Sequence, residues 1–234
     1  LDERAYADRV ARRFATDHRT RFVSPDDYGL LDTLVTHFDE PFADASALPT
    51  YRVCELARDE VTVALSGDGA DEAFAGYRRH LFQHRGERAR SLMPAAIRQP
   101  LFSALGRIYP KMDWAPRFLR AKSTFQELAV SGGEAYARSV GFTPPELRAR
   151  LYTHSFTQKI DGHRAEDRII TAMENAPARD AIDRAQYADL KIWLPGDILT
   201  KTDRMSMAVG LEAREPLLDY RLVEFAGRLP VGQR

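Results

Sequence analysis

A short apolar stretch followed by a small, acidic loop constrains this chain more than any other feature. Residues 61–65, Val-Thr-Val-Ala-Leu, are apolar or β-branched and too few for a helix, so they predict a short buried strand. The segment Ser66-Gly-Asp-Gly-Ala-Asp-Glu72 comes next, and its two glycines permit a tight turn. From Asp71 onward, side chains such as Phe74 and Leu81 recur at helical spacing. The pattern therefore predicts a strand, a turn and a helix in succession.

Such a succession is typical of anion sites, because free backbone N–H groups and the positive end of the helix dipole converge there. This loop is also acidic, with Asp68, Asp71 and Glu72 within seven residues. Carboxylates do not bind phosphate directly, so a hard divalent cation such as Mg²⁺ is the natural mediator. The combination indicates nucleotide or pyrophosphate chemistry. The alternative is an ordinary loop that starts a helix, in which Asp71 and Glu72 only stabilise the first turn.

Composition excludes several classes of protein. The chain has 34 basic and 34 acidic side chains among 234 residues, so its charge favours neither nucleic acid nor a membrane surface as partner. No apolar run approaches the length of a membrane span, and no signal-peptide pattern is present. Cys54 is the single cysteine, which excludes an intramolecular disulfide and fits a reducing compartment. We therefore expect a cytoplasmic protein.

The first 90 residues have the pattern of an α/β unit. An apolar stripe of helical period covers residues 26–38, and Pro41 follows its end. Ser46 is expected to cap a second helix, which leads to the strand at 61–65. In a parallel sheet of this kind ligands bind at the carboxyl ends of strands, where the acidic loop lies.

Beyond residue 90 the chain is strongly helical in pattern. Pro195 and Gly196 are expected to interrupt it, and Asp197 to cap a helix over residues 197–209. Its Lys201 and Arg204 could neutralise pyrophosphate, or they could be an ordinary solvated face. The aromatic side chains of the helical part are expected in the core: Phe102, Tyr109, Trp114, Phe118, Phe125 and Trp193.

Three segments together resemble one family. They are Asp39-Glu-Pro-Phe-Ala-Asp-Ala-Ser46, Ser66-Gly-Asp-Gly-Ala-Asp-Glu-Ala-Phe-Ala-Gly-Tyr77, and the stretch from Leu194-Pro-Gly-Asp to Pro-Leu-Leu-Asp219. In this order they resemble the asparagine synthetase family, which are ATP-dependent amidotransferases. The resemblance spans residues 39–230.

The resemblance implies a Rossmann-like fold of the adenine-nucleotide α-hydrolase type, with a parallel sheet and a large helical portion. Residues 1–234 would be an internal part of a C-terminal synthetase domain, with a nucleotide-binding part at 1–90 and a mainly helical part at 91–234. The resemblance further implies that ATP activates the aspartate side chain as an acyl-adenylate, that Mg²⁺ holds the pyrophosphate, and that an N-terminal glutaminase domain supplies ammonia from glutamine.

The resemblance also implies roles for single residues. Ser66 and Gly67 would contact the nucleotide, and Asp71 would hold Mg²⁺-pyrophosphate. Asp68 occupies the position where the family has an acidic residue near the reacting centre, so it would be the catalytic residue that handles the ammonia proton. Four further residues would lie near the substrate pocket: Glu40, Asp44, Lys201 and Arg204.

The chain departs from the family in ways that leave alternatives open. The Ser-Gly-Gly-x-Asp-Ser pyrophosphate loop, a lysine after the last helix, and the glutaminase cysteine do not occur in it, so this segment alone is expected to be inactive. Ala70 replaces a more usual glycine, a mild change unless that backbone is left-handed. Residues 109–116 look most like an amidotransferase branch associated with exosortase and exopolysaccharide genes, which would change the carboxylate that is amidated. A non-catalytic scaffold of the same fold also remains open, and so does a homodimer.

Overall fold

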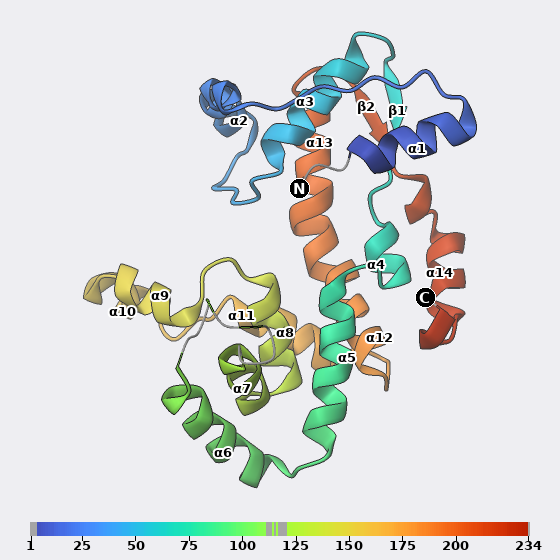
Figure 1. The fold of residues 1–234 in the computed structure, drawn as a ribbon. Coiled ribbons are helices and arrows are strands. Elements are labelled where there is room, and N and C mark those ends of the chain that lie inside the picture. Colours follow the sequence, from blue (N-terminus) through green and yellow to red (C-terminus); the bar gives the residue numbers. More distant parts are fainter. Residues whose placement is uncertain (1–3, 111–113, 115, 117–120, 234) are drawn as a thin grey trace. The chain divides into compact units, whose positions relative to one another are not determined.

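The chain folds into two compact units, each drawn in Figure 1. The first unit contains Leu1–Ser66 and Asp197–Pro216, and the second contains Gly67–Gly196 and Leu217–Arg234. The structure, a computed structural model, describes residues 4–110, 114, 116 and 121–233. The expected division of a synthetase domain into a nucleotide-binding part at 1–90 and a mainly helical part at 91–234 stays a prediction.

A parallel pair of strands marks the first unit. Strand β1 (Val63–Leu65) pairs with β2 (Glu212–Arg214), with Ala64 opposite Ala213. The expected strand is therefore confirmed at its carboxyl end, but β2 had no signal in the sequence. The expectation that this strand is buried is wrong for the described residues, because Leu65 is 74% exposed. Parallel strands are usually buried because helices pack on both faces of their sheet. In the first unit helix α13 contacts β2.

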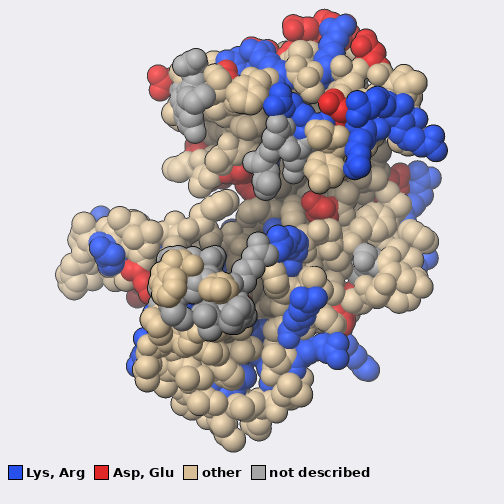
Figure 2. All heavy atoms as spheres, in the orientation of Figure 1, with Lys and Arg blue, Asp and Glu red and all other residues tan. Residues whose placement is uncertain are grey.

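The helices of the first unit surround a small apolar core. Helix α2 packs with α3 and α13, and the core is built around buried Leu34, Leu48 and Met205. Basic side chains gather over α1 in Figure 2, where Arg12 and Arg13 occupy its last turn. The bounds are α1 Arg4–Phe14, the 3-10 helix Pro25–Leu30, α2 Leu31–His37, α3 Ala47–Arg58 and α13 Thr200–Met207.

The second unit is helical. Helix α6 packs on α7, α8 on α11, and α5 on α12, and buried Tyr136, Met173 and Ala185 lie in its core. Within the described residues no helix has both the length and the apolar character needed to cross a bilayer. The bounds are α4 Ala70–Phe74, α5 Arg78–Ser91, α6 Ala95–Ile108, α7 Lys122–Ala129, α8 Gly132–Val140, α9 Pro145–Leu151, α10 His154–Ile160, α11 Glu166–Glu174, α12 Ala181–Ala188 and α14 Tyr220–Arg228.

Two expected helices differ from the observed ones. The helix expected from Asp71 onward is divided, because Ala75 adopts a left-handed conformation (φ 56°) that ends α4 before α5 begins. The expected interruption at Pro195 is also wrong. The chain continues there as a π-helix, Asp189–Leu199, and runs directly into α13. Proline lacks the N–H of an α-helical bond, and a local change to wider π-type turns is one way a helix accommodates it.

The aromatic side chains expected in the core are only partly there. Phe102 and Tyr109 both contact the ring of Phe125, and Trp193 packs against the core of the second unit. Trp114 is exposed, which contradicts the expectation. Phe118 lies outside the described residues, as does much of the stretch 109–116 on which the branch assignment depends.

Candidate functional site

The acidic loop begins where β1 ends. The backbone N–H of Ser66 donates to the carbonyl oxygen of Arg214 at 2.8 Å, which extends the parallel ladder by one residue. The chain passes from the first unit to the second between Ser66 and Gly67. Ser66 and Asp68 are half-buried and Gly67 is exposed. The loop thus follows the carboxyl end of a parallel strand, as the sequence predicts.

Only one of the two loop glycines is required by the backbone. Gly69 has φ 88° and precedes α4, and a Cβ on it would overlap the side chain of Leu218. A Cβ on Gly67 would meet open space, so the turn does not demand a glycine there. Ala70 begins α4 in a right-handed conformation, which explains why alanine is tolerated at this position.

The acidic side chains at the start of α4 lie in contrasting surroundings. Asp71 is exposed, whereas Glu72 is 1% exposed. The hydroxyl of Tyr77 donates to Glu72 Oε1 at 2.7 Å, and burial together with this contact raises the pKa of Tyr77. Tyr77 therefore remains a donor at neutral pH. The Glu72 carboxylate is therefore buried and bonded within the protein, whereas the Asp71 carboxylate is accessible to a ligand.

Magnesium in phosphate-transfer sites is commonly held by one or two carboxylates together with substrate phosphates. An accessible Asp71 fits that requirement. Among the described residues there is no cluster of three or more His, Cys, Asp or Glu side chains that could hold a metal ion. The residues fit a cation that arrives with a phosphate ligand.

In the first unit the structure joins two residues that the sequence named separately. Lys201 Nζ lies 2.7 Å from Asp44 Oδ2 and 2.7 Å from the hydroxyl oxygen of Ser46. Burial alone would raise the pKa of Asp44, but the contacts with Lys201 and Ser46 outweigh it and hold that pKa below its usual value. Ser46 precedes α3, yet its side chain makes no capping bond, because Asp44 and Lys201 engage it.

The other two residues predicted near the substrate, Glu40 and Arg204, are more exposed than Asp44 and Lys201. Arg204 forms an ion pair with Asp39 at 2.7 Å, and both side chains are exposed. Glu40 is exposed and lines a hollow of about 730 Å³ together with Asp44. The walls of this hollow are mainly apolar side chains of α2, of the residue that follows it and of α3: Leu31, Leu34, Val35, Phe38, Ala47 and Leu48.

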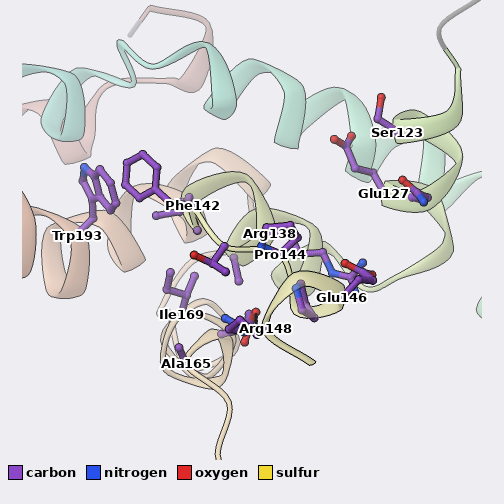
Figure 3. A pocket seen from close by; sticks show the side chains of 17 residues that line it. Ser123, Glu127, Arg138, Phe142, Pro144, Glu146, Arg148, Ala165, Ile169 and Trp193 are labelled. Atoms are coloured by element: carbon purple, nitrogen blue, oxygen red, sulfur yellow. Dashed lines mark hydrogen bonds and ion pairs between the residues drawn. The ribbon is translucent and has the colours of Figure 1, made fainter. Parts of the chain in front are cut away.

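A second hollow, of about 480 Å³, is lined by none of the predicted residues (Figure 3). Arg138, Arg148 and Trp193 line it. Its two arginines already pair with carboxylates, Arg138 with Glu134 and Arg148 with Glu166. The paired guanidinium groups leave little positive charge for an anionic ligand, and we assign this hollow no function.

Sequence reasoning missed a buried polar centre in the second unit. Asp189 is 1% exposed, and its Oδ2 lies 2.6 Å from the hydroxyl oxygen of Tyr136, 2.8 Å from His80 Nε2 and 3.0 Å from Arg79 Nη2. Burial raises the pKa of Tyr136, and the neighbouring carboxylate of Asp189 raises it further. The Arg79 guanidinium also lies over the ring of Trp193, 5.1 Å from its centroid.

Gln186, one turn earlier, was missed as well. It is 4% exposed, and its Nε2 donates at 2.8 Å both to the carbonyl of Glu72 and to that of Ala73. A signal existed, because residues 182, 185, 186 and 189 share one helix face and two of them are apolar. Polar side chains on the apolar face of a helix are candidates for a buried network.

Comparisons with known proteins agree with these observations. A family model described as asparagine synthase matches residues 1–234. Asparagine synthetase 1 (glutamine-hydrolyzing) of Bacillus subtilis is 30% identical over 228 residues, 96% of this chain and 34% of that protein. A Methanocaldococcus jannaschii protein with the provisional name asparagine synthetase 2 (glutamine-hydrolyzing) is 45% identical over 160 residues, 68% of this chain and 30% of that protein.

A more distant relative has a different name. Amidase chyE of Penicillium rubens is 25% identical over 253 residues, which is 98% of this chain and 35% of that protein. The chain spans about a third of the length of these curated relatives. No solved structure shows a significant match.

Proposed function

Because this chain belongs to the asparagine synthase family, we propose that it forms the ATP-using part of a glutamine-dependent amidotransferase that converts aspartate to asparagine. The family has the adenine-nucleotide α-hydrolase fold, so the expected fold class is confirmed. ATP and Mg²⁺ are the proposed nucleotide and metal. An N-terminal glutaminase domain in the intact protein is the proposed source of ammonia, which agrees with the longer relatives.

The observation that carries this proposal is the loop Ser66–Glu72. It follows the carboxyl end of a parallel strand, it contains a glycine in a left-handed conformation, and it presents Asp71 to solvent while Glu72 is buried. An accessible carboxylate beside a small-residue turn suits a phosphate group that arrives with a cation.

The proposed reaction has two displacement steps. The aspartate carboxylate attacks the α-phosphorus of ATP, the bond from that phosphorus to the bridging oxygen breaks, and pyrophosphate leaves. Ammonia then attacks the acyl carbon, the bond to AMP breaks, and the nitrogen loses a proton. When bound, Mg²⁺ supplies positive charge that stabilises the leaving pyrophosphate.

The residues of this chain have proposed roles in that reaction. Ser66 and Gly67 contact the nucleotide through hydroxyl and backbone groups. Asp71 is the metal-holding carboxylate, and Asp68 accepts the proton from ammonia. The pair Lys201–Asp44 stands near the substrate, where an anionic ligand could exchange with Asp44 for the ammonium group; Glu40 and Arg204 lie in the same unit.

The test is pyrophosphate release by the full-length protein given ATP, Mg²⁺ and ammonia, with and without aspartate. Release that depends on aspartate and yields asparagine supports the proposal. Release only with another carboxylic acid keeps the reaction type and overturns aspartate as the acceptor. If no acid supports pyrophosphate release, the proposed enzymatic function is overturned in favour of a non-catalytic scaffold. The exopolysaccharide branch stays a prediction.

A single substitution tests the metal role. Asp71→Asn removes the accessible charge, and we expect pyrophosphate release to fall on the order of a hundredfold while glutamine hydrolysis continues. Asp161→Asn is the matched control, because Asp161 is exposed in the same unit and its left-handed backbone suits asparagine. Normal pyrophosphate release by Asp71→Asn would remove this residue from the metal site.

A further inference from the structure

Helix α4 is a single turn that cannot be stable by itself. It spans only Ala70–Phe74, and isolated helices of this length are not stable in water. The carbonyl groups in the last turn of any helix have no partner within it. In α4 two of these carbonyls, those of Glu72 and Ala73, accept hydrogen bonds from Gln186 Nε2. A side chain more than 110 residues away in sequence thus completes this turn.

The side of α4 that carries Glu72 is held as well. The Glu72 carboxylate accepts from Tyr77 and is excluded from solvent. Gln186 and Tyr77 therefore hold both the backbone and the buried carboxylate of α4, and we call these three residues the α4 clamp: Glu72, Tyr77 and Gln186. The clamp leaves no role for Glu72 as a metal ligand.

The helix that carries Gln186 is itself fixed. Asp189, three residues further along, accepts from Tyr136 and Arg79 and contacts His80, so helices α5 and α8 both hold it. Moving Asp189 away from these donors would leave a buried carboxylate uncompensated, which is strongly destabilising. The contacts of Asp189 therefore resist displacement of the helix that carries Gln186.

The position of Asp71 follows from that of α4. Its carbonyl oxygen accepts from the N–H of Gly76 at 3.0 Å, and its carboxylate packs against the Cα of Gly76, where a Cβ would overlap Oδ1. The carboxylate therefore has a defined direction as long as the turn 70–76 keeps its shape. Displacement of α4 would move Asp71 even though Asp71 itself is unchanged.

We propose that Gln186 is a positioning residue for the Asp71 carboxylate, acting through the α4 clamp, and that Glu72 is an anchor of this clamp. The inference rests on the proposed function, because it assigns Asp71 the role of holding metal-bound pyrophosphate. Gln186 touches neither nucleotide nor metal in this scheme. Its effect is on affinity for the metal–pyrophosphate group.

The experiment compares two buried glutamines of the second unit in the full-length protein. Gln83 is 6% exposed and donates to the carbonyl of Gly132, so Gln83→Met and Gln186→Met each remove one buried amide of the same size. We expect a similar fall in Tm for both variants. Calorimetric binding of pyrophosphate with Mg²⁺ should weaken about tenfold in Gln186→Met and stay nearly unchanged in Gln83→Met.

A second measurement separates the clamp from the proposed function. Hydrogen exchange of the backbone amides in residues 69–77 should be faster in Gln186→Met than in the wild type, and unchanged in Gln83→Met. Tyr77→Phe, which keeps the ring, should give a smaller change of the same kind. Equal exchange or equal pyrophosphate affinity in the two methionine variants would overturn the positioning role. Faster exchange with no pyrophosphate binding by the wild type would instead overturn the proposed function, and the assigned role of Asp71 with it.

Discussion

Each unit contains a carboxylate that is largely shielded from solvent and paired with a cation, and the two pairs differ in kind. Asp44 in the first unit meets one lysine and one serine, and its side chain is 15% exposed. Asp189 in the second unit meets an arginine, a tyrosine and a histidine, and its side chain is 2% exposed. An ammonium group on a flexible stem can change partners easily, whereas a planar guanidinium in a three-donor network cannot. The first pair suits exchange with a ligand, and the second suits fixed architecture.

The largest effect should follow from breaking the fixed centre. Asp189→Ala leaves Arg79, His80 and Tyr136 without their common acceptor, and we expect the free energy of unfolding to fall by about 3–5 kcal/mol. Denaturant unfolding monitored by circular dichroism measures this loss. Asp219→Ala is the control, because it removes a helix cap together with a solvent-accessible ion pair to Arg221, which should cost only about 1–2 kcal/mol. Similar losses for the two variants would show that Asp189 is not a structural centre.

Removing the exchangeable cation should cost less stability. Lys201→Met leaves Asp44 with Ser46 and partial hydration, so we expect a loss of about 1–2 kcal/mol. Arg204→Met on the same helix removes an exposed ion pair and should cost roughly 0–1 kcal/mol. Denaturant titrations of both variants test the order. A loss for Lys201→Met as large as that for Asp189→Ala would contradict the distinction between the two centres.

The smallest effect concerns acid sensitivity. Because the folded-state pKa of Asp44 lies below its ordinary value of 3.8, this residue contributes stability above that pH, and the contribution disappears as pH falls through the folded-state pKa. Between pH 5 and about pH 3 the wild type should therefore lose more stability than Asp44→Asn. Unfolding curves at a series of pH values measure the difference. Identical pH dependence would mean that Asp44 titrates as an unpaired carboxyl group.

Local sequence patterns predicted much of the fold. The strand before the acidic loop and the helix after Ser46 both appear where the pattern places them. The division between α4 and α5 could not be predicted, because Ala75 is a good helix former and its left-handed backbone is set by tertiary contacts. The π-helix through Pro195 escaped prediction for a similar reason, since a proline followed by a glycine normally ends a helix.

The candidate site was predicted as a set of residue types but not as a set of contacts. Asp44 and Lys201 were both named from the sequence, yet their direct pairing depends on segments 157 residues apart. Glu72 was grouped with Asp68 and Asp71 as an acidic residue of the loop, and the structure buries it. Gln186 and Asp189 were missed, because polar side chains on an amphipathic helix are usually exposed. The roles of the named residues in catalysis stay predictions.

The contact between Arg79 and Trp193 has an optical consequence. The chain has two tryptophans, of which Trp114 is exposed and Trp193 is half-buried beside the guanidinium that holds Asp189. Indole emission shifts to longer wavelengths and is quenched by dissolved iodide when the ring meets water. In a Trp114→Phe variant the tryptophan fluorescence would come from Trp193 alone. The wavelength and intensity of that emission would then report whether the buried centre around Asp189 is intact.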